Sequence, residues 1–199
     1  ILVQLIKREY IFEAAEYYER ALLDTEQRFG GDHKRLTERL RSLADTYLNL
    51  GRYDDAERHY RRELDLDLKE YGADELRPAE LLRKLAVNCA RAGRLDEAIQ
   101  WYQQACQSYQ RYDPDNTVAI ADAQWDMAHE YIAQRRFDEA RALYQTVRDY
   151  YVQHYRPASW VAVDVMCDLA KLEREQGRLD EAEALLREGR RYGKVFQDK

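Results

Sequence analysis

Residues 93–98 read Gly-Arg-Leu-Asp-Glu-Ala and open the segment GRLDEAIQWY, which ends at Tyr102. Four other segments align with this one without a gap, and each copy begins 42 residues after the previous one. They are EYIFEAAEYY (9–18), GRYDDAERHY (51–60), RRFDEARALY (135–144) and GRLDEAEALL (177–186). Self-similarity at a fixed period of this length is the signature of a repeat protein.

Three columns of this alignment are restricted in residue type. The sixth residue is always Ala (14, 56, 98, 140 and 182), the third is always apolar, and the tenth is Tyr except at Leu186. A second pattern precedes each later copy, namely Leu43-Ala44-x-x-Tyr47, Leu85-Ala86-x-x-Cys89, Met127-Ala128-x-x-Tyr131 and Leu169-Ala170-x-x-Glu173. The apolar spacing is helical. Each repeat is therefore predicted to be a helix A, a short turn around Gly-Arg and a helix B, with the Ala columns allowing close helix contact.

The predicted helices span 11–29, 34–50, 53–71, 76–92, 95–112, 116–134, 137–155, 158–176 and 179–196. We expect residues 1–8 to be the tail of one more helix A. Gly51, Gly93 and Gly177 suit the left-handed residue that ends a helix, whereas Arg135 departs from this pattern. Expected N-caps are Asp32, Asp74, Asn116 or Thr117, and Ser159.

Composition excludes several classes of protein. The 199 residues include only 8 Gly and 3 Pro, which favours a nearly all-helical chain long enough to bury a core. The apolar runs are too short for a transmembrane helix. The net charge of −6 disfavours general nucleic-acid affinity. Cys89, Cys106 and Cys167 form no C-x-x-C pair and are read as packed thiols in a reducing, cytoplasmic compartment.

These motifs resemble tetratricopeptide repeats over essentially the whole chain, and the 42-residue period is similar to that of kinesin light chains. The resemblance implies an all-α fold, a right-handed α-solenoid of antiparallel helix pairs whose helices A line a concave groove. The expected single domain, 1–199, holds a partial repeat (1–33) and repeats 34–75, 76–117, 118–159 and 160–199. Ser42, Lys84, Asp126 and Asp168 stand where that group carries Asn, so its cargo specificity is not carried over.

The polar stripe of helix A is the candidate binding surface for a peptide or helix of a partner protein. Its charge changes sign along the chain, and Trp125 is the expected apolar anchor. The candidate groove residues are Arg41, Asp45, Asn49, Arg83, Lys84, Arg91, Asp122, Trp125, Asp126, His129, Asp164, Asp168 and Lys171. The open alternative is a solvated face of mixed charge, in which ion pairs merely satisfy one another.

No phosphate-binding loop, nucleophile elbow or metal-ligand motif occurs, so we expect neither enzymatic activity nor a cofactor. Asp126 and His129 are spaced to bridge a metal, but a polar face is favoured. The acids of Glu63–Leu68 are read as a broad acidic helix face.

The chain lacks an initial Met, and we expect more protein before residue 1. Alternative functions are a sensor region of a larger ATPase or protease, and a scaffold or homodimer joined through exposed end helices such as the one carrying Leu185 and Leu186.

Overall fold

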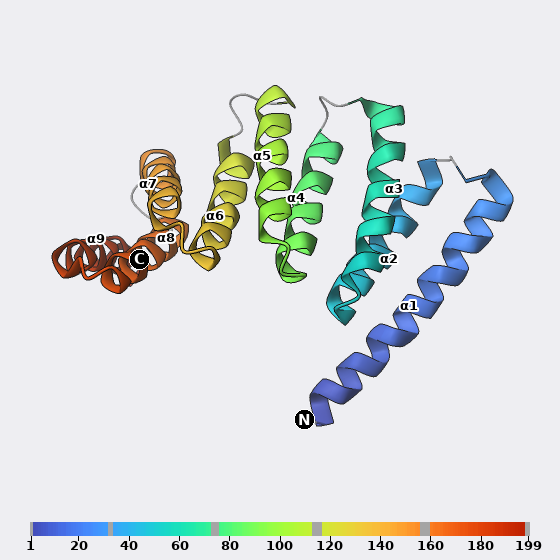
Figure 1. Ribbon diagram of the computed structural model, residues 1–199, viewed down its shortest axis with the longest axis horizontal. Helices are drawn as coiled ribbons and strands as arrows, with labels where there is room; N and C mark the ends of the chain where they lie inside the picture. The colour runs from blue at the N-terminus through green and yellow to red at the C-terminus, as the bar shows by residue number, and fades with distance from the viewer. Residues whose placement is uncertain (1, 32–33, 73–75, 113–116, 156–159, 198–199) are drawn as a thin grey trace. The chain divides into compact units, whose positions relative to one another are not determined.

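A computed structural model describes residues 2–31, 34–72, 76–112, 117–155 and 160–197 (Figure 1). Within these ranges the side chains of 2–8, 117 and 193–197 are outside the description. The helices are α1 (Leu2–Phe29), η1 (Lys34–Leu36, a 3-10 turn), α2 (Thr37–Leu50), α3 (Tyr53–Tyr71), α4 (Leu76–Arg91), α5 (Leu95–Tyr112), α6 (Thr117–Ala133), α7 (Phe137–His154), α8 (Trp160–Glu175) and α9 (Leu179–Gln197). In this described part of the chain no helix is long and apolar enough to cross a membrane.

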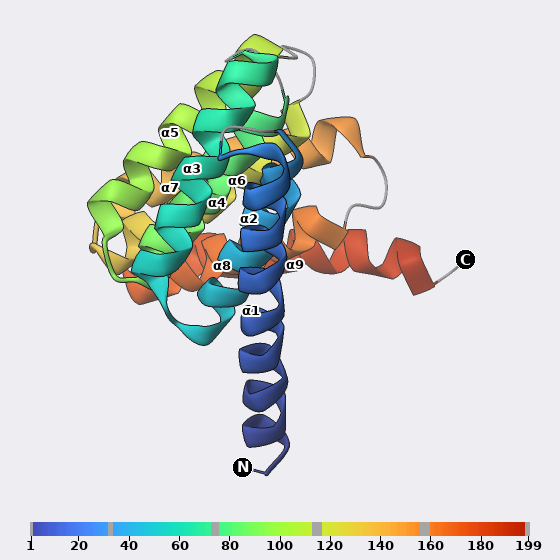
Figure 2. The same cartoon turned by 90° about the vertical axis from the view of Figure 1, so that its right-hand side faces the viewer.

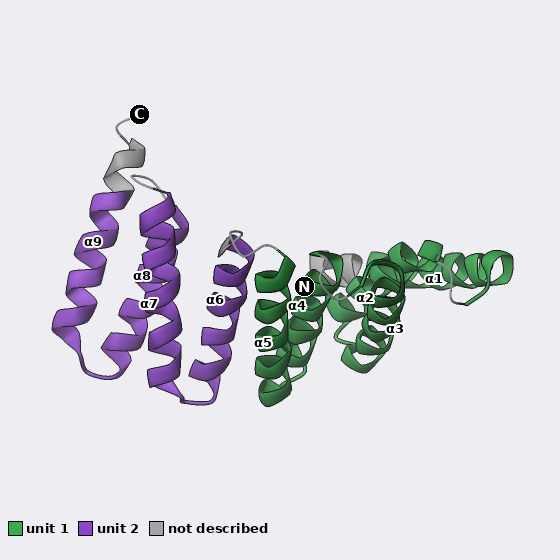
Figure 3. Ribbon diagram, turned by 90° about the horizontal axis from the view of Figure 1, so that it is seen from above, with its two compact units in different colours: residues 1–112 green, residues 113–199 purple. Residues whose placement is uncertain are grey.

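The chain forms two compact units, residues 1–112 (unit 1) and 113–199 (unit 2), which are described separately (Figure 3). In unit 1, α2 pairs with α3 and α4 with α5, while α3 also packs against α4. In unit 2, α6 pairs with α7 and α8 with α9, and α7 packs against α8. The predicted helix pairs are therefore confirmed. The single-domain organisation stays a prediction.

The first helix differs from the prediction. The separate helix tail expected at residues 1–8 is wrong, because α1 runs without a break from Leu2 to Phe29. Its N-terminal end extends past α2 and α3 (Figure 2). The later repeats place Gly or a left-handed Arg before helix B, but Glu9-Tyr10 occupies the corresponding position here, and nothing there forces the helix to end.

The turns between helices A and B depend on a residue with positive φ. Gly51, Gly93 and Gly177 have φ of 75°, 78° and 77°, as predicted for residues that end a helix. Arg135 adopts the same conformation with φ of 61°, at a cost of about 1–2 kcal/mol for a residue with a Cβ. The turn geometry is thus kept where the glycine is missing. Three of the four expected N-cap positions (32, 74 and 159) lie outside the described residues, as does Asn116, and the side chain of Thr117 is not described.

The repeat columns form the core. The Ala residues of helix A (44, 86, 128 and 170) and those of helix B (56, 98, 140 and 182) are all buried. Tyr60, Tyr102 and Tyr144 fill the space beside them and are at most 2% exposed. Leu186 occupies the same column in the last repeat and is 45% exposed. A residue in this column of the repeat is therefore buried only where the next helix of the chain covers it.

In two repeats the arginine after the positive-φ turn residue lies over a tyrosine ring of helix A. The guanidinium of Arg52 lies 4.3 Å from the Tyr47 ring centroid, and that of Arg136 lies 4.4 Å from the Tyr131 ring. Glu173 replaces the tyrosine in the last repeat and is buried. Its carboxylate accepts hydrogen bonds from Arg178 and, at 2.7 Å, from Nε of Arg141 on α7. A charged clamp thus replaces the stacked ring there.

Candidate functional site

In unit 1 the helix-A stripe carries an ion pair between neighbouring repeats. Lys84 Nζ of α4 lies 2.6 Å from Asp45 Oδ1 of α2, and both side chains are more than one third exposed. The buried Tyr60 of α3 donates its hydroxyl to the same Asp45 oxygen. Burial and the Asp45 carboxylate raise the pKa of the Tyr60 hydroxyl. Two predicted site residues are thus brought together above a buried tyrosine.

Arg41 is held by a buried acidic pair. Its Nε donates to Glu63 Oε1 at 2.7 Å, and its Nη2 lies 3.8 Å from Asp67 Oδ2. Arg77 at the start of α4 reaches Asp67 from the other side, with Nε 3.3 Å from Oδ2. Burial raises the pKa of Glu63 to about 7, although Arg41 opposes this shift. Arg41 therefore serves the packing of unit 1 as well as its surface.

The acidic face predicted for Glu63–Leu68 is wrong for two of its three acids. The side chains of Glu63 and Asp67 are fully buried, and only Asp65 points to solvent. The reason is that Arg41 and Arg77 neutralise both carboxylates from adjacent helices, so burial is tolerated. The repeat alignment could have indicated that Glu63 is buried. The equivalent positions 21, 105 and 147 hold Ala or Val, which are typical core residues.

In unit 2 four predicted residues meet around one carboxylate. Trp125 Nε1 of α6 donates to Asp168 Oδ2 of α8 at 3.1 Å, and His129 Nε2 lies 3.4 Å from the same oxygen. Lys171 Nζ donates to Asp168 Oδ1 at 2.8 Å. The Asp168 side chain is 19% exposed, whereas His129 and Lys171 are about half or more exposed. We call these four residues the Trp125 cluster.

The electrostatics of the Trp125 cluster fix its protonation states. Burial acts against the Asp168 charge, but hydrogen bonds from His129, Lys171 and Trp125 outweigh it and lower the pKa of Asp168 to about 2. The Asp168 carboxylate in turn raises the pKa of His129, against the opposing effect of burial. The cluster therefore holds a carboxylate at neutral pH and a histidine that gains its proton at higher pH than usual. It presents an oriented indole next to the Lys171 ammonium and the His129 ring.

Beneath this cluster lies Tyr144, in the same repeat column as Tyr60. Its ring centroid lies 5.7 Å from that of His129, and its hydroxyl is buried with no hydrogen-bond partner among the described atoms. His129 occupies the repeat position that Asp45 holds in unit 1, which removes the acceptor. At the same repeat position, the Tyr60 hydroxyl of unit 1 therefore has a hydrogen-bond acceptor, whereas the Tyr144 hydroxyl of unit 2 has none among the described atoms.

This contrast predicts opposite effects for the same substitution. Tyr144→Phe is expected to raise the free energy of unfolding of unit 2 by about 1 kcal/mol, because it removes a buried hydroxyl without a partner. Tyr60→Phe is expected to lower that of unit 1 by about 1–2 kcal/mol, because it removes a hydrogen bond to a carboxylate. Urea denaturation of the two variants checks the signs. Equal losses in both would contradict the assignment of the Tyr144 hydroxyl.

The other predicted site residues are dispersed. Asp122 of α6 accepts a hydrogen bond from the Tyr151 hydroxyl at 2.6 Å, and Arg83 and Asp126 are half-buried. Asn49, Arg91 and Asp164 are exposed, and within the described residues no hydrogen bond or ion pair involves them. The helix-A stripe is therefore organised at two places, the Asp45–Lys84 pair and the Trp125 cluster.

One group of side chains in the described ranges could hold a metal ion, namely Glu57, Cys89 and Glu97. Arg94 pairs with both of its carboxylates, reaching Glu97 at 3.1 Å. Burial raises the pKa of the Cys89 thiol to about 11, so the thiol keeps its proton at neutral pH. The positive charge of Arg94 already occupies this position, and the residues fit a salt-bridge network better than a metal site. All three cysteines are free.

Comparisons with known proteins agree with this architecture. No curated protein sequence matches the chain. Among solved structures, BtubC (BKLC) of P. vanneervenii aligns with a TM-score of 0.80 and 18% identity over 97% of this chain and 77% of its own. The nearly identical TPR-like repeats of a Podosopora anserina kinesin light chain align with a TM-score of 0.82 and 18% identity, over 97% of this chain and 91% of theirs.

A Rap protein complexed with competence and sporulation factor aligns with a TM-score of 0.69 and 17% identity, over 98% of this chain and 52% of its own. These likenesses confirm the all-α solenoid fold. Two tetratricopeptide repeat models match the sequence itself, one over residues 11–69 and 36–111 and the other over residues 126–194. Together they cover most of the chain, which belongs to the tetratricopeptide repeat family.

Proposed function

We propose that this chain is a non-enzymatic interaction module whose helix-A face binds a peptide or helix of a partner protein. Tetratricopeptide repeats mediate protein–protein interaction in general. The Rap protein complexed with competence and sporulation factor supports a bound partner on the same fold. The three free cysteines are in keeping with a reducing, cytoplasmic compartment.

The observation that carries this proposal is the Trp125 cluster. Tryptophan is among the residues that contribute most to binding energy at interfaces. The Asp168 carboxylate holds the indole in one orientation, so little side-chain freedom is lost when a partner covers it. Lys171 places one positive charge beside the Asp168 carboxylate. The site therefore suits an apolar side chain of a partner.

The test is peptide selection followed by affinity measurement. Peptides are selected from a random display library on the immobilised chain and then titrated by calorimetry. Trp125→Ala is expected to weaken binding by about 30-fold or more, as for a central interface residue. Trp160→Ala removes a 66% exposed tryptophan from the same unit and is expected to change affinity less than about threefold. Equal affinity for both variants would refute the helix-A site.

A second candidate function is self-association as a scaffold or homodimer through an exposed end helix. It is favoured by α1, on which Tyr10, Phe12, Tyr17 and Leu23 are each at least 46% exposed. Tyr10 and Tyr17 lie on one face of this helix and Phe12 and Leu23 on the opposite face, and exposed apolar side chains can mark an interaction surface. Sedimentation of the chain over a range of concentrations tests this candidate, and a monomer at all concentrations rejects it.

A further inference from the structure

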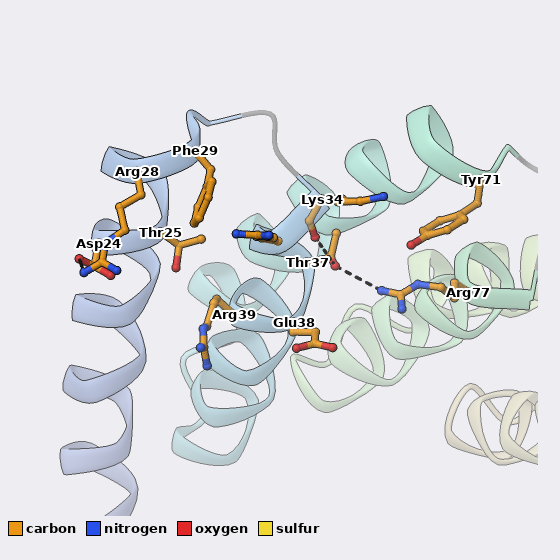
Figure 4. Close-up of a pocket in the computed structure, with 11 residues that line it drawn as sticks. Asp24, Thr25, Arg28, Phe29, Lys34, Thr37, Glu38, Arg39, Tyr71 and Arg77 are labelled. Atoms are coloured by element: carbon orange, nitrogen blue, oxygen red, sulfur yellow. Dashed lines mark hydrogen bonds and ion pairs between the residues drawn. The ribbon is translucent and has the colours of Figure 1, made fainter.

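A cavity of about 550 Å3 opens in unit 1 where α1 ends and where α2 and α4 begin (Figure 4). Its walls come from α1, η1, α2, the end of α3 and the start of α4. The volume lies within the range of about 300–1,000 Å3 that is usual for ligand pockets. None of its lining residues belongs to the Trp125 cluster, which lies in unit 2.

The lining is rich in positive charge. Five cationic side chains face two carboxylates, those of Asp24 and Glu38, in a chain whose net charge is −6. The cations are Arg28, Lys34, Arg35, Arg39 and Arg77. Arg28 pairs with Asp24 at 2.9 Å, and Lys34 pairs at 2.9 Å with Glu70. Arg39 is exposed and pairs with no described carboxylate.

Two arginines lie over aromatic rings of this cavity. The Arg35 guanidinium lies 4.3 Å from the Phe29 ring centroid, and that of Arg77 lies 5.3 Å from the Tyr71 ring. Arg77 is also held by Asp67 and by the Thr37 hydroxyl, to which its Nη2 donates at 3.3 Å. A guanidinium held over a ring still has N–H groups that can donate to a carboxylate or phosphate.

We propose that this cavity binds an oxyanion group, a carboxylate or a phosphate, carried by an acidic peptide segment of a partner protein. Arg35 and Arg39 donate to the oxyanion, and Phe29 and Tyr71 contact the adjoining peptide. Asp24 and Glu38, together with the negative charge of the whole chain, oppose a long polyanion such as a nucleic acid. The site is separate from the helix-A site proposed above and does not depend on it.

The test uses fluorescence anisotropy with four labelled probes at low salt. They are tetraglutamate, a phosphoserine peptide, tetraglutamine and a short single-stranded DNA. Arg35→Gln/Arg39→Gln is expected to weaken binding of the tetraglutamate or phosphoserine probe by about tenfold or more, because hydrogen bonds to charged groups are lost. The control, Arg20→Gln/Arg58→Gln, removes the same charge from two exposed arginines of unit 1 and is expected to change binding less than about twofold.

Several outcomes would overturn the proposal. These are equal binding of tetraglutamate and tetraglutamine, equal losses in the test and control variants, and tighter binding of the DNA than of either acidic peptide. The stronger of the two acidic probes identifies the oxyanion, and either one supports the site. If the double variant does not fold, as judged by circular dichroism, Arg39→Gln alone decides, because Arg39 makes no ion pair with a described carboxylate. Trp125→Ala is expected to leave acidic-probe binding unchanged, which separates this site from the helix-A site.

Discussion

Replacing Arg41 with methionine is expected to lower the free energy of unfolding of unit 1 by about 3–5 kcal/mol at pH 8, the usual cost of breaking a buried ion pair. The methionine fills much of the arginine's volume but leaves Glu63 without its main cationic partner, in a position where the carboxylate is fully buried. Urea unfolding followed by circular dichroism measures the loss.

The same variant has a predictable pH dependence. The pKa of Glu63 rises from 4.5 to about 7 on folding, so between these values the folded chain binds a proton that the unfolded chain has released. The contribution of Glu63 to stability therefore decreases as pH rises from about 4.5 to about 7. The loss caused by Arg41→Met is accordingly expected to be smaller at pH 5 than at pH 8.

Arg41→Met/Glu63→Gln provides the control, because it removes the buried charge together with its partner. It is expected to recover about half or more of the stability lost in Arg41→Met, since a neutral amide costs less to bury than a carboxylate. An Arg41→Met loss that is the same at both pH values, with no recovery in the double variant, would mean that Arg41 stabilises unit 1 through its hydrocarbon stem alone.

The second large effect concerns two residues of one repeat column. Tyr144→Ala is expected to destabilise unit 2 by about 3–5 kcal/mol, the usual cost of emptying the space of a buried aromatic ring. Leu186→Ala is expected to cost less than about 1 kcal/mol, because Leu186 is 45% exposed and has little packing to lose. Thermal and urea unfolding of both variants make the comparison. A similar loss in both would mean that α9 is covered in solution.

Most of the fold could be predicted from the sequence because the same pattern recurs in each repeat. A helix or turn that is uncertain in one copy is supported by the equivalent residues of the others. Four of the five copies each fix a helix turn, and the predicted helices after the first agree with the structure to within two residues when η1 is counted with α2. The helix expected over 11–29 is present, but the break expected before it is absent, for a physical reason. Its expected break rested on the alignment register alone, whereas Glu9-Tyr10 supplies no residue that favours a left-handed turn.

The candidate site was only partly predictable. Trp125 and Asp168 are 43 residues apart and Lys84 and Asp45 are 39 apart, so both contacts join equivalent faces of successive helices A. The 42-residue period predicts that such residues lie close together. It does not predict which of the nearby side chains will form the hydrogen bond or ion pair. Glu63 and Asp67 escaped prediction because polar residues are read as exposed when the cations that neutralise them come from other helices.

Glu173 limits how the repeats can be reordered. Its carboxylate joins Arg141 of the preceding helix to Arg178 of its own turn, a combination that the tyrosines at the same position of other repeats cannot replace. Exchanging this segment for a copy with tyrosine would leave Arg141 with Asp138 and Gln176 as its remaining partners. Moving it elsewhere would bury an acid without Arg141. A chain that looks modular by its spacing therefore carries one junction that cannot be exchanged freely between its copies.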